Sequence, residues 1–191
     1  GMSMVEQGDA DAFITGLYTK YSNTIKVAKD VIGIRDEYKT FGTMHILNTQ
    51  KGVYYIADTL INRRPDEDVL TDIAKLSAGT VKLFNEEPVM DMLSYSNFGT
   101  DNVGSPVKVK KAVAEMQKEF PELAIDGEMQ VNYALNKDLR DEKYPFSRLK
   151  GKDVNTLVFP NLSSANGAYK LLQALNPEAE IIGPIQMGLN K

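Results

Sequence analysis

Small polar residues follow three predicted strands at the points where each strand ends. Residues 94–99, 126–128 and 161–163 occupy these positions and supply hydroxyl, amide and carboxylate groups. If the strands are parallel neighbours, their carboxyl ends meet at one edge of a sheet, where open α/β sheets bind ligands. The sequence therefore predicts one crevice that gathers all three runs. The alternative, that each run is an ordinary polar loop or helix cap, stays open because fold-level signals do not fix function.

The third of these runs lies in a stretch that makes the prediction concrete. Residues 156–159 are predicted to form a strand, and Pro160 ends it because proline has no N–H to donate to a sheet. A helix is predicted to begin near Ser163. The N–H groups of its first turn lack partners within the helix, so they favour anionic groups. The predicted apolar stripe of this helix consists of Leu171, Leu172 and Leu175.

Other chemistries find less support in the sequence. Asp126 and Glu128 could form an acid/base pair, but two carboxylates at this spacing are common in turns. The chain has 0 cysteines, so thiolate chemistry is excluded, and with 1 histidine a histidine-based triad has nothing else to draw on. That histidine, His45, lies in an apolar strand and is expected to be structural or on the surface. No glycine-rich nucleotide motif occurs, and no cluster of histidine or cysteine completes a metal site.

The composition is typical of a globular protein. The 191 residues carry a net charge of −4, which gives no basic footprint for nucleic acid. No apolar run reaches the roughly 18 residues of a membrane span. The lack of cysteine and of a signal pattern is typical of a cytoplasmic protein. Gly1 before Met2 is typical of a cloning remnant, so we expect the chain to be a piece of a longer protein.

Alternating strands and helices predict a three-layer α/β/α domain with a mixed sheet. Strands 43–48 and 53–57 form a predicted antiparallel hairpin. The other predicted strands are 12–16, 89–93, 123–126, 154–159 and 181–182. The predicted helices begin at Ser22 or Asn23, Pro65, Ser105 and Ser163, and residues 127–129 are predicted to turn into a short helix that contains Val131 and Ala134. Residues 136–153 are predicted to be a charged surface loop, and Lys108, Lys110 and Lys111 a solvated helix face.

Five motifs, in register over a hundred residues, resemble the signatures of the phosphate acetyl/butyryltransferases. They are Leu93-Ser94-Tyr95-Ser96, Asp126-Gly127-Glu128-Met129-Gln130, Phe159-Pro160-Asn161-Leu162, Ala165-Asn166-Gly167-Ala168-Tyr169-Lys170 and Gly183-Pro184-Ile185. The resemblance implies a fold like that of isocitrate and isopropylmalate dehydrogenases, with two α/β/α domains, a cleft between them and usually a homodimer. Residues 1–20 are then expected to be a fragment of the neighbouring domain, and residues 21–191 the phosphotransacetylase-like central domain.

The chain also departs from the active members of this family. Active members carry Ser-Thr-Lys-Gly where residues 96–99 read Ser-Asn-Phe-Gly. That form, with residues 146–151, is similar to the phosphotransacetylase-like C-terminal domain of NADP-dependent malic enzymes. Lys26 stands where active members carry a phosphate-binding arginine, and lysine lacks the planar, bidentate fork. The family's Ser-Arg-Gly run and catalytic aspartate lie beyond the point where this sequence ends, so no catalytic residue is assigned here.

The resemblance supports two main functional hypotheses. The first is an acyl-CoA-binding regulatory domain of an NADP-dependent malic enzyme, with acetyl-CoA or CoA as ligand. NADP and a divalent metal would then belong only to the malic-enzyme half, and no metal site is assigned to this chain. The alternative is an active phosphate acetyltransferase, and a structural dimerisation module is a third reading. The expected acyl-CoA and phosphate contacts are Lys26, Ser94, Ser96, Gly99, Asn161, Ser163, Asn166 and Lys170.

Overall fold

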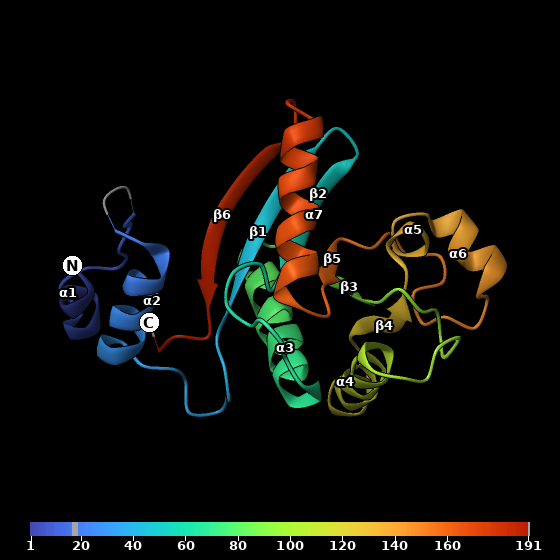
Figure 1. Cartoon of the computed structure of the whole chain (residues 1–191), viewed down its shortest axis with the longest axis horizontal. Coiled ribbons are helices and arrows are strands. Elements are labelled where there is room, and N and C mark those ends of the chain that lie inside the picture. The colour runs from blue at the N-terminus through green and yellow to red at the C-terminus, as the bar shows by residue number, and fades with distance from the viewer. Residues whose placement is uncertain (17–18, 191) are drawn as a thin grey trace.

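A six-stranded sheet runs through the centre of the chain (Figure 1). The computed structural model describes residues 1–16 and 19–190, so Leu17, Tyr18 and Lys191 lie outside the described residues. The order of the strands across the sheet is β4-β3-β5-β2-β1-β6. Their bounds are β1 Gly42–Thr49, β2 Gly52–Ala57, β3 Val89–Leu93, β4 Ala124–Met129, β5 Thr156–Val158 and β6 Glu180–Met187.

The sheet is mixed, as predicted, because β1 runs against its two neighbours. β1 pairs antiparallel with β2 and with β6, whereas β2, β5, β3 and β4 pair parallel with one another. The predicted hairpin is confirmed, with Thr49 opposite Gly52 at its turn. The carboxyl ends of the four parallel strands therefore meet at one edge of the sheet, and we refer to this edge as the carboxyl edge.

Helices cover both faces of the sheet and give three layers. Helices α3 and α4 pack on one face over a core that includes Met44, Ile73 and Met116. Helix α7 lies on the other face with α5, over a core that includes Leu157 and Tyr169. The helix bounds are α1 Met2–Gln7, α2 Tyr21–Val31, α3 Glu67–Leu83, α4 Ser105–Glu119, α5 Val131–Ala134, α6 Lys137–Lys143 and α7 Leu162–Leu175. In the described part of the chain, every helix is too short or too polar to cross a membrane.

Local chemistry explains where the central elements begin. The side chain of Asp66 caps α3 by accepting a hydrogen bond from Val69 N (2.9 Å), which satisfies one of the unpaired N–H groups of that helix. Ile73 and Leu70 of α3 are fully buried against the sheet, and each such side chain contributes about 1.5–3 kcal/mol. The methionines expected in the core, Met90, Met92, Met116 and Met129, are all fully buried.

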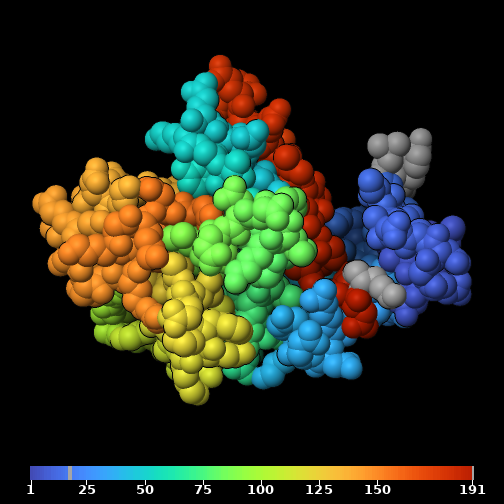
Figure 2. All heavy atoms as spheres, turned by 180° about the vertical axis from the view of Figure 1, so that it is seen from behind, coloured from blue at the N-terminus to red at the C-terminus, as the bar shows by residue number. Residues whose placement is uncertain are grey.

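The structure corrects several element predictions near the N-terminus. Residues 12–16 form no strand and are exposed, because no neighbouring strand pairs with them. Helix α2 begins at Tyr21 instead of after a Ser22 or Asn23 cap, and its N-cap Lys20 makes no side-chain hydrogen bond. Helices α1 and α2 lie at the end of the molecule opposite α5 and α6 (Figures 1 and 2).

Four further predictions in the second half of the chain are wrong in part. Residues 136–153 contain helix α6, and Arg140 on this helix is fully buried. Leu171 and Leu175, predicted to be the apolar stripe of α7, are 60% and 75% exposed, whereas Ala165 and Tyr169 form its buried side. Strand β4 continues beyond residue 126 to Met129, and β6 is longer than the two residues expected.

Candidate ligand-binding site

A pocket of about 440 Å³ opens at the carboxyl edge of the sheet. Three segments line it: the loop after β2, the start of α4 and the start of α7. The lining residues are Arg63, Arg64, Ser105, Lys108, Asn161 and Ser163. We call this the Arg63–Arg64 pocket. It contains two of the residues predicted from the sequence, Asn161 and Ser163, and it lies at the edge where the sequence predicted a crevice.

Asp58 holds the loop that carries the two arginines. Its side chain is 3% exposed, at the end of β2, and its carboxylate accepts hydrogen bonds from Thr43 N (3.0 Å) and Thr43 Oγ1 (2.8 Å). The same carboxylate accepts from Asn62 N (2.6 Å) and Asn62 Nδ2 (2.7 Å). Asp58 therefore caps this loop and fixes the backbone directly before Arg63.

Asn161 begins α7 and places Ser163 in the pocket wall. The Asn161 side chain accepts a hydrogen bond from Ser164 N (3.0 Å) and so acts as the N-cap. The remaining N–H groups of the first turn lack partners within the helix and favour a negative charge. The predicted start of the helix near Ser163 is therefore confirmed, with the cap two residues earlier.

Lys108 is fixed in the pocket instead of lying free on a solvated helix face, which corrects the prediction from sequence. Its ammonium group donates to Pro65 O (2.7 Å) and to Pro160 O (2.9 Å), and so ties α4 to both of the other segments. Burial lowers the pKa of Lys108, while the nearby carboxylates of Asp66 and Glu67 oppose that shift. The backbone carbonyls and these carboxylates favour the charged form, so Lys108 adds a positive charge to the pocket wall.

The loop after β3 is closed upon itself. Ser96 is 1% exposed, and its hydroxyl bonds Thr100 Oγ1 (2.9 Å) and accepts from Asp101 N (2.9 Å). Glu128 Oε1 accepts from Gly99 N (2.5 Å) and from Ser96 Oγ (3.3 Å), and ties this loop to β4. Ser94 is also buried, and its Oγ accepts from Ser96 N (3.1 Å). Ser94, Ser96 and Gly99 therefore shape the loop and do not line the Arg63–Arg64 pocket.

The remaining predicted residues lie outside the pocket wall. Asn166 is half-buried on α7, and its Nδ2 lies 3.3 Å from Thr59 O. Lys170 is exposed one turn further along the same helix. Lys26 is exposed on α2. The structure thus brings Asn161 and Ser163 together in one pocket and leaves Lys26, Asn166 and Lys170 away from its lining.

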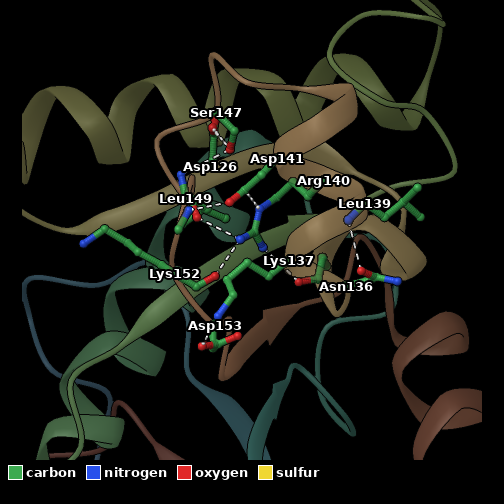
Figure 3. Close-up of polar contacts among 12 residues, drawn as sticks. Asp126, Asn136, Lys137, Leu139, Arg140, Asp141, Ser147, Leu149, Lys152 and Asp153 are labelled. Carbon is green, nitrogen blue, oxygen red and sulfur yellow. Dashed lines mark hydrogen bonds and ion pairs between the residues drawn. The ribbon is translucent and has the colours of Figure 1, made fainter.

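The carboxylates considered as an acid/base pair both make structural hydrogen bonds, Glu128 through Oε1 alone among the described residues. Asp126 Oδ2 accepts from Ser147 Oγ (2.7 Å) and Arg148 N (2.8 Å), as Figure 3 shows for the serine. Glu128 holds the β3 loop as described above. His45 is 5% exposed, with Nδ1 2.8 Å from Thr59 Oγ1 and its ring stacked on Tyr169 at 4.3 Å. These contacts give His45 a structural role, as the sequence predicted.

Sequence reasoning missed the four pocket residues that precede residue 161. These are Arg63, Arg64, Ser105 and Lys108. The signal for two of them was present, because adjacent arginines stand between the end of β2 and Pro65 before a helix. Such a pair at a carboxyl edge is a candidate anion site. The signal for Lys108 was absent, since only the packing of α4 against residues 65 and 160 fixes it.

Comparisons with known proteins agree on one family. Residues 1–191 match the family described as phosphate acetyl/butaryl transferase. An NADP-dependent malic enzyme of Escherichia coli (strain K12) is 40% identical over 191 residues, which are 100% of this chain and 25% of that protein. A phosphate acetyltransferase of Bacillus subtilis (strain 168) is 36% identical over 190 residues, which are 100% of this chain and 58% of that protein.

A solved structure gives the same result. A phosphotransacetylase from Streptococcus pyogenes matches with a TM-score of 0.92 and 33% identity, covering 100% of this chain and 58% of that chain. The chain therefore spans a quarter of the length of this malic enzyme and 58% of the length of each of these two transferases.

Proposed function

Since the chain belongs to the phosphate acetyl/butyryltransferase family, we propose that it is an acyl-CoA-binding regulatory domain of an NADP-dependent malic enzyme. The parent protein would oxidise and decarboxylate malate to pyruvate with NADP and a divalent metal in its other half. Acetyl-CoA or a related acyl-CoA would bind in the part described here. In this proposal the fold is of the isocitrate-dehydrogenase-like type, residues 1–20 belong to a neighbouring domain, and the protein is a homodimer.

The observation that carries this proposal is the packing of Phe98. It stands where active members, by resemblance, carry the lysine of Ser-Thr-Lys-Gly. Its ring centroid lies 5.0 Å from that of Tyr144 and 5.0 Å from that of Phe146, so it joins an aromatic cluster formed by the residues that follow α6. A cation at the β3 loop is thus replaced by a ring that helps to close the loop. This supports a site that binds an acyl-CoA without transferring its acyl group.

The predicted contacts take different roles in this proposal. Asn161 and Ser163 would contact the ligand from the pocket wall. Ser94, Ser96 and Gly99 would shape the loop beside the acyl and pantetheine end. Lys26, Asn166 and Lys170 would reach the ligand from the rim of the cleft.

A matched pair of variants at Ser163 tests the binding site in the full-length protein. Ser163→Asp places a negative charge in the pocket wall, and acidic residues stabilise the first turn of a helix, so the fold is preserved. Ser163→Asn has nearly the same shape without the charge. Calorimetry should show acetyl-CoA binding weakened about tenfold or more by Ser163→Asp and much less by Ser163→Asn. Equal affinities for the two variants would contradict ligand binding at this wall.

A rate measurement tests regulation. We expect acetyl-CoA to change the rate of NADP-dependent malate oxidation by the full-length protein, and Ser163→Asp to reduce that change. If acetyl-CoA gives no heat of binding and no change in rate, the regulatory proposal is wrong.

The second candidate function is that of an active phosphate acetyltransferase, which exchanges acetyl-CoA and phosphate for acetyl phosphate and CoA. The similarity to the transferases of Bacillus subtilis and Streptococcus pyogenes supports it. Trapping of acetyl phosphate with hydroxylamine separates the two functions. Product formed by the full-length protein would support the transferase and contradict the purely regulatory proposal.

A further inference from the structure

We propose that His45 is a positioning residue for the loop of residues 58–64, which follows β2 and forms one wall of the Arg63–Arg64 pocket. Its Nδ1–H begins a chain of hydrogen bonds that runs in one direction through two threonine hydroxyls to the Asp58 carboxylate. That the loop lies beside an acyl-CoA rests on the function proposed above. The hydrogen-bond chain does not, because it follows from the contacts and the available hydrogens of four side chains.

Four buried side chains form this chain of contacts. His45 Nδ1 lies 2.8 Å from Thr59 Oγ1, and Thr59 Oγ1 lies 3.0 Å from Thr43 Oγ1. Thr43 Oγ1 in turn donates to Asp58 Oδ1 at 2.8 Å. His45 is 5% exposed, Asp58 is 3% exposed and both threonines are fully buried. Bulk water therefore does not compete for these hydrogen bonds.

The available hydrogens set the direction of the chain. A carboxylate has only acceptors, so the single hydroxyl hydrogen of Thr43 lies in its contact with Asp58. The contact between the two threonines must then use the hydroxyl hydrogen of Thr59. No hydroxyl hydrogen is left for the contact with His45, so the imidazole supplies one from Nδ1. Burial lowers the pKa of His45, which favours the neutral ring, and the one N–H of that ring is on Nδ1.

Asp58 passes this constraint on to the loop. Its carboxylate accepts hydrogen bonds from the backbone N–H groups of Leu60 (3.2 Å), Ile61 (3.3 Å) and Asn62 (2.6 Å). Hydrogen bonds that point the same way along a chain strengthen one another, and Thr59 itself is a residue of the loop. Without the donor at residue 45, the hydroxyl of Thr59 is free to turn away, and the loop loses order directly before Arg63.

Two elements far apart in the sequence, α7 and β6, hold the imidazole ring in place. Tyr169 of α7 stacks on it, with ring centroids 4.3 Å apart and an angle of 17° between the rings. Gly183 of β6 lies against it as well, because an added Cβ there would be 3.0 Å from His45 Cδ2. Asn166 of α7 also donates to Thr59 O (3.3 Å). These contacts fix the orientation in which Nδ1 faces Thr59.

Asparagine and glutamine at residue 45 separate the role of the donor from that of the ring. The side-chain amide of asparagine places an N–H close to the position of Nδ1, whereas that of glutamine reaches the position of Nε2. Both substitutions remove the ring that stacks on Tyr169, and both side chains are uncharged. A role in packing alone predicts equal losses for His45→Asn and His45→Gln. The hydrogen-bond chain predicts that only His45→Asn keeps the loop in order.

The first measurement is hydrogen–deuterium exchange of the full-length protein without ligand. The reporters are the N–H groups of residues 60–62, which donate to the Asp58 carboxylate. They should exchange about three- to tenfold faster than the wild type in His45→Gln and stay within about twofold of it in His45→Asn. Thr59→Val, which lacks the hydroxyl, should resemble His45→Gln, and Thr59→Ser should resemble the wild type. Peptides from α4, on the opposite face of the sheet, should exchange alike in all variants and show that the fold is intact.

The second measurement is calorimetry with acetyl-CoA on the same variants. The affinity should fall about three- to tenfold in His45→Gln and Thr59→Val, because ordering the loop then costs entropy at the moment of binding. It should stay within about twofold of the wild type in His45→Asn and Thr59→Ser. Neither residue 45 nor residue 59 lines the Arg63–Arg64 pocket, so a loss reports the position of the loop and not a missing contact.

The outcomes distinguish this inference from the proposed function. Equal exchange in His45→Asn and His45→Gln would overturn the inference, and faster exchange in His45→Asn would place the proton on Nε2 and overturn it as well. The expected exchange rates with an unchanged affinity in every variant would contradict the positioning role. If the wild type binds no acetyl-CoA, the acyl-CoA proposal is wrong, and the exchange rates still decide whether His45 holds the loop.

Discussion

Arginine occurs in two contrasting settings in this chain. On α6, the side chain of Arg140 is fully buried and donates to Ala134 O (3.1 Å), Leu149 O (2.8 Å) and Lys152 O (2.5 Å) (Figure 3). At the carboxyl edge, Arg63 and Arg64 are exposed and make no such contact among the described residues. The guanidinium group is thus held by three backbone carbonyls in one region and left available in the other.

The difference shows how to separate a structural cation from a binding one. A guanidinium has five N–H donors and no acceptor, so its role follows from what already occupies those donors. Arg140 ties the segment after α6 back to that helix, and it is fully buried, so a ligand cannot reach it. Arg63 and Arg64 contribute no contact that the fold needs. Variants in the first region should therefore change stability, and variants in the second should change binding.

The largest effect is expected for Arg140→Ala. The change leaves three carbonyl groups without their donor, and it removes the positive charge that opposes the rise in the pKa of the buried Asp91 carboxyl. We expect the free energy of unfolding to fall by about 3–5 kcal/mol, as for other broken buried charge networks. Urea denaturation gives the size of the loss, and hydrogen–deuterium exchange of peptides from residues 137–153 locates it.

Arg148→Ala is the matched control for this variant. Arg148 is exposed, and its side chain makes one hydrogen bond, to Pro121 O (2.6 Å), so the change should cost about 1 kcal/mol or less. If Arg140→Ala costs no more than Arg148→Ala, the carbonyl cluster does not hold α6 in place.

A second large effect is expected for Gly127→Ala, where β4 passes close to β3. Gly127 has a φ of 135°, and an added Cβ would lie 2.5 Å from Met92 O in the neighbouring strand. We expect a loss of about 2–4 kcal/mol, since neither backbone can move without breaking sheet hydrogen bonds. Gly79→Ala is the control, because an added Cβ in the middle of α3 meets nothing within 4 Å. That variant should gain about 0.5–1 kcal/mol in the same urea titration, and equal losses at both glycines would contradict the close approach.

A smaller effect, visible as pH dependence, is expected for Asp91→Asn. Burial, and then the nearby carboxylate of Asp126, raise the pKa of Asp91 well above its ordinary value of 3.8, and Arg140 opposes them. The unfolded chain therefore loses this proton at lower pH than the folded chain does. Stability should fall as pH rises above about 4 until the folded-state pKa is passed.

The asparagine cannot ionise, so this part of the pH dependence should disappear. The variant should gain on the wild type between pH 4.5 and pH 7, by about 1.4 kcal/mol for each unit that separates the two pKa values. Urea midpoints measured at both pH values give the difference. Parallel pH profiles for the two proteins would show that Asp91 ionises as easily in the folded state as in the unfolded one.

The sequence predicted the sheet well because strand and helix patterns there follow local rules. The alternation of elements, the hairpin at residues 49–52 and the Asp66 start of α3 were all accessible from residue type and spacing. The strand predicted at residues 12–16 was wrong because an apolar run forms a strand only when another strand pairs with it. Arg140 was predicted to lie in a surface loop because charged residues are usually exposed. The sequence does not show that three backbone carbonyls accept hydrogen bonds from its guanidinium group.

The candidate site was predictable in position but only partly in composition. Asn161 and Ser163 follow a strand directly, so the rule of the carboxyl edge identified them. Ser96 obeys the same rule, yet its hydroxyl is turned into its own loop by Thr100 and Asp101, which no spacing reveals. Lys108 joins the pocket only through the packing of α4 against two prolyl carbonyls. Which groups are free to bind is therefore a property of tertiary contacts.

The smallest effect we predict concerns Glu67, whose negative charge could compete with a ligand for the exposed arginines. Lys111 holds the Glu67 carboxylate at 2.9 Å, and this pairing lowers the pKa of Glu67. Lys111→Met removes the partner and leaves the carboxylate free, three residues after Arg64 in the sequence. Because both side chains are exposed, the free energy of unfolding should hardly change. Affinity for acetyl-CoA should fall about two- to threefold, since Glu67 would compete for the pocket cations.

Salt and a second variant test this reasoning. The loss should shrink at high ionic strength, where exposed charges are screened, and it should vanish in Lys111→Met/Glu67→Gln, which lacks the competing carboxylate. A loss as large as that of Arg63→Gln/Arg64→Gln would mean that Lys111 itself contacts the ligand. No loss at low salt would mean that the Glu67 carboxylate does not reach the pocket. The two arginines would then lack an acidic partner because the acids of α3 are too far away, and the other partners of those acids would not be the reason.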